Sequence, residues 1–85
     1  MKQKEIIVKL PSGLEAKPVA MFVQIAGKFQ CQISVEYNRR QVNAKSIMGM
    51  MSLGIAPGEK VVVTAEGQDE DEAIRSIEEY LTGEE

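Results

Sequence analysis

The chain has 85 residues and a net charge of -3, with 44% hydrophobic and 27% charged residues and no histidine. This length and composition predict a single ordered domain, residues 1–85, with one modest core. The acidic balance argues against nonspecific binding to nucleic acid, so any contact with DNA should be indirect. No segment reaches the ~20 apolar residues that span a bilayer, and the polar N-terminus is unlike a signal peptide. We therefore expect a cytoplasmic protein with no membrane contact.

Alternating apolar residues predict a first strand from Ile6 to Leu10, which Pro11-Ser12-Gly13 ends. A helix should begin at Ala16, with a proline in its first turn, and end near Gly27. The apolar face of this helix should consist of Val19, Phe22, Val23 and Ala26.

The next segment has the alternation of a half-buried strand, followed by a turn at Asn38-Arg39 and a short partner strand over 40–43. The inward residues of the first of these strands should be Cys31, Ile33, Val35 and Tyr37. Cys31 cannot form an internal disulfide, which fits a reducing compartment. We interpret it as a small core residue, because a catalytic cysteine normally needs a basic partner and no histidine is present.

Ser46 stands immediately before a short apolar run, the position of a helix N-cap. A helix of about two turns should follow, placing Ile47, Met50 and Met51 in the core and leaving Met48 at least partly exposed. Gly49, inside this helix, either permits a close approach at its apolar patch or makes the helix a weakly stable, dynamic element.

A valine-rich strand over 60–65 and a last helix with an acidic first turn complete the chain. The buried residues of that helix should be Ala73, Ile74, Ile77, Tyr80 and Leu81, and Gly83 should end it. The order of elements predicts an α+β fold with helices on one face of an antiparallel sheet. Arg39-Arg40 and the acidic run 69–72 are explained by a turn and a helix start, and neither is given a binding role.

Two segments and the acidic start of the last helix carry a family resemblance that spans the chain. They are Gly13-Leu14-Glu15-Ala16-Lys17-Pro18 and Asn43-Ala44-Lys45-Ser46-Ile47-Met48-Gly49-Met50-Met51-Ser52-Leu53. With them the chain resembles the HPr family, the small phosphocarriers of the bacterial sugar phosphotransferase system. The resemblance implies an open-faced β-sandwich, a four-stranded antiparallel sheet with three helices on one face.

In that family, the motif Gly-Leu-x-Ala-Arg-Pro holds the active histidine at x, where this chain has Glu15. The chain therefore looks more like the Crh branch of the family, found in bacilli, which lacks the histidine but keeps a regulatory serine. Glutamine is usual at x in that branch, and Glu15 departs from it. We interpret Glu15 as a helix-capping acid that points at the N–H groups of residues 16 to 18. The alternative is a fixed charge that imitates phosphohistidine and shapes the choice of partner.

Lys17 stands where the family has arginine; it keeps the charge but loses the planar fork that grips a phosphate bidentately. It is either a solvated surface lysine or, as the resemblance implies, a contact for the partner proteins. The resemblance also implies a docking role for Ile47 and Met48, as an apolar patch beside Ser46. Methionine suits such a surface because its side chain is pliable and polarisable.

The function implied by the resemblance is regulation of carbon catabolite repression. Ser46 would be phosphorylated by the bifunctional HPr kinase/phosphorylase, and the product would act as corepressor of catabolite control protein A. The alternative is an unphosphorylated modulator that binds a metabolic enzyme through Glu15, Lys17 and Met48. Sugar phosphotransfer would need the missing histidine. We find no constellation for catalysis, so we expect no enzyme activity, no cofactor and no metal site.

Crh-like proteins can form a homodimer by exchanging the first strand, and the loop Leu10 to Gly13 could serve as the hinge.

Overall fold

The computed structural model describes residues 1–11 and 13–83. The predicted order of elements is confirmed. The elements are β1 (Lys2–Ile7), α1 (Ala16–Gly27), β2 (Gln32–Tyr37), β3 (Arg40–Asn43), α2 (Ile47–Met51), β4 (Lys60–Glu66) and α3 (Glu70–Thr82).

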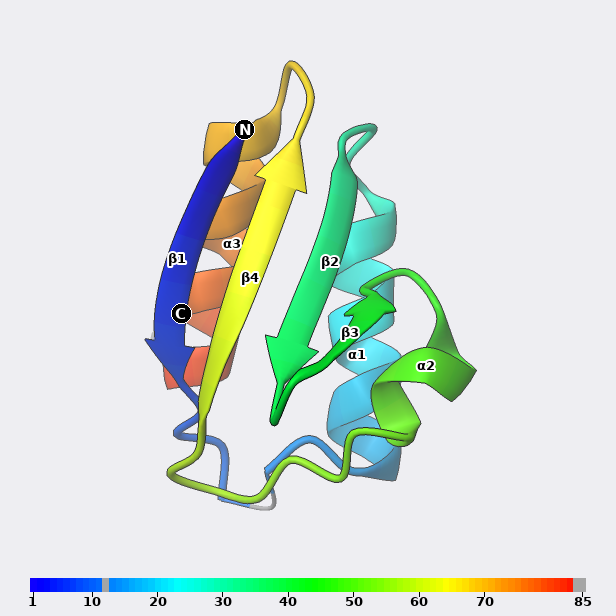
Figure 1. The fold of residues 1–85 in the computed structure, drawn as a ribbon, viewed down its shortest axis with the longest axis vertical. Helices are drawn as coiled ribbons and strands as arrows, with labels where there is room; N and C mark the ends of the chain where they lie inside the picture. The colour runs from blue at the N-terminus through cyan, green and yellow to red at the C-terminus, as the bar shows by residue number, and fades with distance from the viewer. Residues whose placement is uncertain (12, 84–85) are drawn as a thin grey trace.

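The four strands form one antiparallel sheet in the order β1-β4-β2-β3. The helices α1 and α3 lie across one face of this sheet, and the opposite face is open (Figure 1). The helix α3 packs on β1 and β4, whereas the short α2 packs against α1 and β3 at the edge of the sheet. This is the α+β fold that the order of elements predicts and the open-faced sandwich that the resemblance implies.

The core lies between the sheet and the two long helices. Strand residues alternate between this core and the open face, as in β2, where Ile33 and Val35 are buried and Gln32 is exposed. The predicted inward faces of α1 and α3 are largely confirmed, since Val19, Phe22, Ala26, Ala73, Ile74, Ile77 and Leu81 are buried. Val23 and Tyr80 pack against this core while remaining partly exposed.

The first strand lies nearer the N-terminus than predicted. It ends at Ile7, and Val8, although buried, continues as loop that exchanges hydrogen bonds with Gly58 and Glu59. Its first residues lack alternating apolar side chains because β1 is an edge strand with exposed lysines. Such lysines commonly protect an edge strand against pairing between molecules. Of the predicted break at 11–13, Ser12 lies outside the described residues.

The turn between β2 and β3 has both central residues in the left-handed region, with φ of 55° at Asn38 and 68° at Arg39. Positive φ at both positions is the geometry of a type I′ turn, whose twist matches a β-hairpin. The predicted hairpin is therefore confirmed. Arg39 adopts a conformation that a non-glycine residue seldom takes.

Candidate functional site

Ser46 is the N-cap of α2, as predicted. Its backbone is extended, with φ -105° and ψ 116°, and its Oγ accepts a hydrogen bond from the Gly49 N–H at 3.1 Å. The backbone reinforces the cap, because the Ser46 carbonyl accepts from the Met50 N–H at 3.0 Å. Ser46 is partly exposed, so its hydroxyl sits on a fixed backbone near the surface.

The helix α2 is shorter than predicted, and this changes which of its side chains are buried. It has five residues, and of the three predicted core residues only Met50 is fully buried. Ile47 and Met51 are 49% and 48% exposed. Their assignment to the core was wrong, because so short a helix at the edge of the sheet buries only the side that meets its neighbours.

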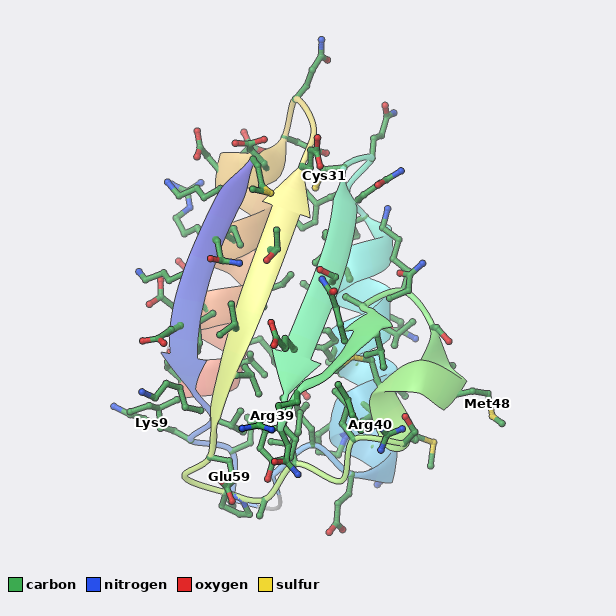
Figure 2. All side chains as sticks on the ribbon, viewed as in Figure 1. Lys9, Cys31, Arg39, Arg40, Met48 and Glu59 are labelled. Carbon is green, nitrogen blue, oxygen red and sulfur yellow. The ribbon has the colours of Figure 1, made fainter. Side chains whose placement is uncertain are left out.

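Met48 is 81% exposed, and this prediction is confirmed. Figure 2 shows its side chain pointing away from the sheet at the far end of α2. Four of the six large hydrophobic residues that are exposed among the described residues lie on α1 or α2: Met21, Ile47, Met48 and Met51. The sequence analysis assigned Met51 to the core and gave Met21 no role, so neither was identified as an exposed apolar residue.

Glu15 is the N-cap residue of α1, with an extended backbone and an exposed side chain. The expectation that its carboxylate caps the helix was wrong, because its side chain makes no capping hydrogen bond. Glutamate is one methylene longer than the residues that cap well, so its carboxylate does not fold back easily onto the first turn. The carboxylate of Glu15 therefore accepts no hydrogen bond from the N–H groups at the start of α1.

The loop before Glu15 is fixed by the loop that follows α2. The Leu14 N–H donates to the Ile55 carbonyl at 2.9 Å, and Gly13 has φ of 66°. A side chain on Gly13 would collide with the Ile55 carbonyl. These contacts connect the first segment that carried the family resemblance to the loop that follows the second. The helix α2 also lies beside the N-terminal half of α1 (Figure 1).

The two lysines of the site differ in their engagement. Lys17 is exposed on the first turn of α1. Lys45, directly before Ser46, is partly buried and donates from Nζ to the Phe29 carbonyl at 2.7 Å. The ammonium of Lys45 therefore uses one of its three N–H donors within the chain, whereas Lys17 is exposed on α1.

Cys31 is buried, as predicted, but it lies directly before β2 and not within the strand. Burial, followed by the neighbouring Asp69, raises the pKa of its thiol to about 11. Little thiolate is present near neutral pH, so this thiol is a poor nucleophile. Close packing surrounds it, since a Cβ on Gly67 would lie 2.6 Å from the Cβ of Cys31.

Within residues 1–11 and 13–83, no group of three or more acidic or cysteine side chains is placed to hold a metal ion. No helix in that part of the chain combines the length and apolarity needed to cross a membrane. A groove of about 800 Å³ lies on the open face of the sheet, lined by polar side chains such as Gln32, Ser34 and Gln41. It does not include Ser46 or Glu15.

Comparison with known proteins identifies the family. The family model described as "PTS HPr component phosphorylation site" matches residues 2–83. The chain belongs to the HPr family. It is 47% identical over 77 residues to the HPr-like protein Crh of Halalkalibacterium halodurans, covering 91% of this chain and 92% of the relative.

Solved HPr-family structures agree with the fold. The phosphocarrier protein HPr from Bacillus anthracis superposes with a TM-score of 0.92 at 45% identity, over 94% of this chain and 95% of the other. Bacillus subtilis Crh, described as an intertwined dimer with a swapping domain, gives 0.79 at 43% identity, over 99% and 97%. Within the HPr family, this chain combines the fold of a phosphocarrier with a sequence that has no histidine.

Proposed function

We propose that this HPr-family protein is a regulator of carbon catabolite repression that is phosphorylated on Ser46 by HPr kinase/phosphorylase and then acts as corepressor of catabolite control protein A. The observation that carries this proposal is the position of Ser46. It is a partly exposed helix N-cap directly before Ile47 and Met48, two side chains that are 49% and 81% exposed.

In the proposed transfer, the Oγ of Ser46 attacks the γ-phosphorus of ATP bound to the kinase. A bond forms between Oγ and phosphorus, the bond to the β,γ-bridging oxygen breaks, and ADP leaves with that electron pair. The hydroxyl proton passes to a base of the kinase. The product adds ~1.5 to 2 negative charges and strong acceptor oxygens at a helix N-terminus, where free N–H groups tolerate them.

The docking surface consists of Glu15, Lys17, Ile47 and Met48, which are exposed on two helices that pack against each other. Ile47 and Met48 would bury apolar area against the partner beside the phosphate, and a basic pocket of the partner would receive the phosphate itself. Lys45, directly before Ser46, is partly buried and uses one ammonium N–H on the Phe29 carbonyl, which leaves two for other acceptors. Binding should weaken as salt rises, because an exposed charge pair is screened.

The phosphocarrier activity of the family is not part of this proposal. Glu15 stands at the position of the active histidine, and a carboxyl phosphate there would hydrolyse readily without a dedicated environment. The carboxylate of Glu15 is exposed and makes no capping hydrogen bond, and it gives the start of α1 a permanent negative charge. We assign no catalytic activity to the chain and place its action in the cytoplasm, where a kinase with ATP can reach it.

Phosphorylation by HPr kinase/phosphorylase and ATP tests the proposal. Mass spectrometry should place one phosphoryl group on Ser46, and the modified protein alone should bind catabolite control protein A appreciably. Ser46→Asn is the matched control, because asparagine caps a helix as well as serine but cannot accept the phosphoryl group. Label on Ser12, Ser34 or Ser52, or equal binding of both forms, would overturn the proposal. Equal binding of both forms to a metabolic enzyme would favour the modulator instead.

We also propose that the chain can form a homodimer by exchange of β1. In the single chain β1 pairs with β4 from Lys2↔Ala65 to Ile7↔Lys60, and Lys4 forms an ion pair with Glu78 of α3 at 2.8 Å. All of these contacts can form between two copies if the hinge opens. That hinge, Leu10 to Gly13, includes Ser12, which lies outside the described residues. Light scattering over a concentration series should detect the dimer, and a constant monomer mass would refute it.

A further inference from the structure

The helix α2 cannot be stable by itself. It has five residues, including a glycine at its centre, and one fully buried side chain, Met50. Isolated helices shorter than about 12 residues are marginal in water, so contacts with the rest of the protein must hold this one. The orientation of Ile47 and Met48 depends on those contacts.

Hydrogen bonds hold α2 at both ends. At the N-terminal end, Ser46 Oγ accepts from the Gly49 N–H. At the C-terminal end, Arg40 donates from Nη1 to the Ser52 carbonyl at 2.9 Å and from Nη2 to Ser52 Oγ at 3.2 Å. Ser52 Oγ in turn donates to the Gly49 carbonyl at 2.6 Å. One chain of hydrogen bonds therefore runs from the β2–β3 hairpin through α2 to Ser46.

The N-terminal bond conflicts with the proposed chemistry. While Ser46 Oγ accepts from Gly49, one of its lone pairs is engaged, and in the phosphorylated product this oxygen becomes an ester oxygen and a poorer acceptor. The cap is therefore weakened during the reaction in which α2 must present Ile47 and Met48 to the kinase. The C-terminal contact has no part in the transfer and is unaffected.

We propose that Arg40 is a positioning residue, which holds the C-terminal end of α2 in place while the cap at Ser46 is exchanged for a phosphate. This inference rests on the proposed phosphorylation of Ser46. The planar guanidinium grips two oxygens of Ser52 at once, which an ammonium on a flexible stem does not reproduce. A cation at the C-terminal end of a helix also meets the negative end of its dipole.

The chain offers a matched control for Arg40. Arg39 carries the same charge in the same turn, and no hydrogen bond or ion pair within residues 1–11 and 13–83 joins it to α2. Figure 2 shows Arg40 beside the lower end of α2, whereas Arg39 lies across the end of the sheet near Glu59. Arg39→Met therefore removes the charge without removing the contact.

The first measurement is amide hydrogen exchange of the unphosphorylated protein by NMR. The Met50 and Ser52 N–H groups donate to the Ser46 and Met48 carbonyls and so report on α2. In Arg40→Met these two amides should exchange roughly fivefold faster, as expected for the loss of a modest net hydrogen-bond contribution. The amides of the central strand β4 should be unchanged. The α2 amides of Arg40→Lys should exchange nearly as fast as those of Arg40→Met, and those of Arg39→Met should exchange at the parent rate. Unchanged α2 amides in Arg40→Met, or equal effects in Arg39→Met, would overturn the proposal.

The second measurement is the kinetics of Ser46 phosphorylation. Arg40→Met should raise the KM for the protein substrate severalfold while kcat and the melting temperature stay close to the parent values. A fall in kcat alone would contradict a positioning role. If the parent is not phosphorylated on Ser46 at all, the proposed function fails, and amide exchange still decides whether Arg40 holds α2.

Discussion

Gly49 and Val42 lie so close together that a Cβ on Gly49 would be 3.3 Å from the Cβ of Val42. The same Cβ would lie 3.3 Å from Ser46 Oγ, the atom that caps the helix. Gly49 therefore makes a close packing contact between α2 and β3. The Ser46 cap and this packing contact both depend on Gly49.

Gly49→Ala should separate stability from recognition. Alanine gains ~1 kcal/mol of helix propensity over glycine, but the added methyl crowds Val42 and Ser46, so the net change in the free energy of unfolding should be under about 1 kcal/mol. The displaced cap should slow phosphorylation of Ser46. Urea unfolding and the kinase assay measure the two effects.

Gly27→Ala is the control for this prediction. Gly27 ends α1 without a positive φ, and beyond its chain neighbours and its own helix backbone nothing lies within 4 Å of the Cβ that would be added. The same substitution should therefore leave phosphorylation unchanged and stabilise the protein slightly. Equal kinase rates for Gly49→Ala and the parent would show that the crowding at α2 is relieved without consequence.

Met48→Asp should leave the fold intact, because this side chain is 81% exposed. It should weaken both phosphorylation by the kinase and binding of the repressor, since it places a charge in an apolar contact. Circular dichroism and thermal melting measure the fold, and the kinase assay and the repressor-binding assay measure recognition. A large loss of melting temperature would mean that Met48 is a core residue.

Met50→Ala provides the contrast within the same helix. Met50 is 0% exposed, and truncating a buried methionine to alanine costs ~2 to 5 kcal/mol. This variant should lose stability, and it should lose recognition only because α2 is no longer held. If Met48→Asp and Met50→Ala destabilise equally, the division of α2 into a buried and an exposed side is wrong.

The buried faces of the long elements were predictable from sequence, whereas the buried side of the short helix α2 was not. The alternation in β2 and the apolar stripe of α3 extend over enough residues that one register fits. In α2, helical spacing alone cannot say how wide its buried side is, because that depends on where α1 and β3 lie. Ile47 and Met51 were therefore assigned to the core, although about half of each side chain is exposed.

The direction of the Glu15 side chain also could not be predicted from the sequence. Its position at the N-cap was predictable from Pro18 in the first turn, but the direction of its carboxylate depends on side-chain length and on the loop that Ile55 fixes. Contacts between distant segments have no local signature. The bond of Arg40 to Ser52 and those of Asp69 to residues 30 and 31 are of this kind.

Glu15→His should test how much of a phosphocarrier site remains. The helix start at Glu15 is preserved, with N–H groups that the Glu15 side chain does not cap, but Lys17 lacks the fork of the family's arginine. We expect partial acceptance of a phosphoryl group from phosphoenolpyruvate and enzyme I, and none by the parent. Glu15→Gln is the control for loss of charge alone. If Glu15→His takes no label, the site differs from a phosphocarrier by more than this residue.

Asp69 joins the start of α3 to the start of β2, and this contact makes stability depend on pH. Its carboxylate accepts hydrogen bonds from the Gln30 N–H at 2.8 Å and the Cys31 N–H at 3.0 Å. The bond from Gln30 first, and that from the Cys31 side chain second, lower the pKa of Asp69 from its ordinary value of 3.8. The folded protein therefore binds this proton less readily than the unfolded chain does.

The stabilisation from Asp69 should be fully present above its ordinary pKa and should disappear as the pH falls through the lowered value of the folded state. Asp69→Asn keeps one acceptor oxygen but cannot titrate, so it should be less stable than the parent at pH 7. The difference should shrink in acid, as urea unfolding of both proteins at pH 7 and at about pH 3 can measure. NMR titration of the Asp69 carboxyl carbon should give a midpoint below that of an unfolded aspartate. A stability difference that is the same at both pH values would mean that the charge of Asp69 contributes nothing beyond its shape.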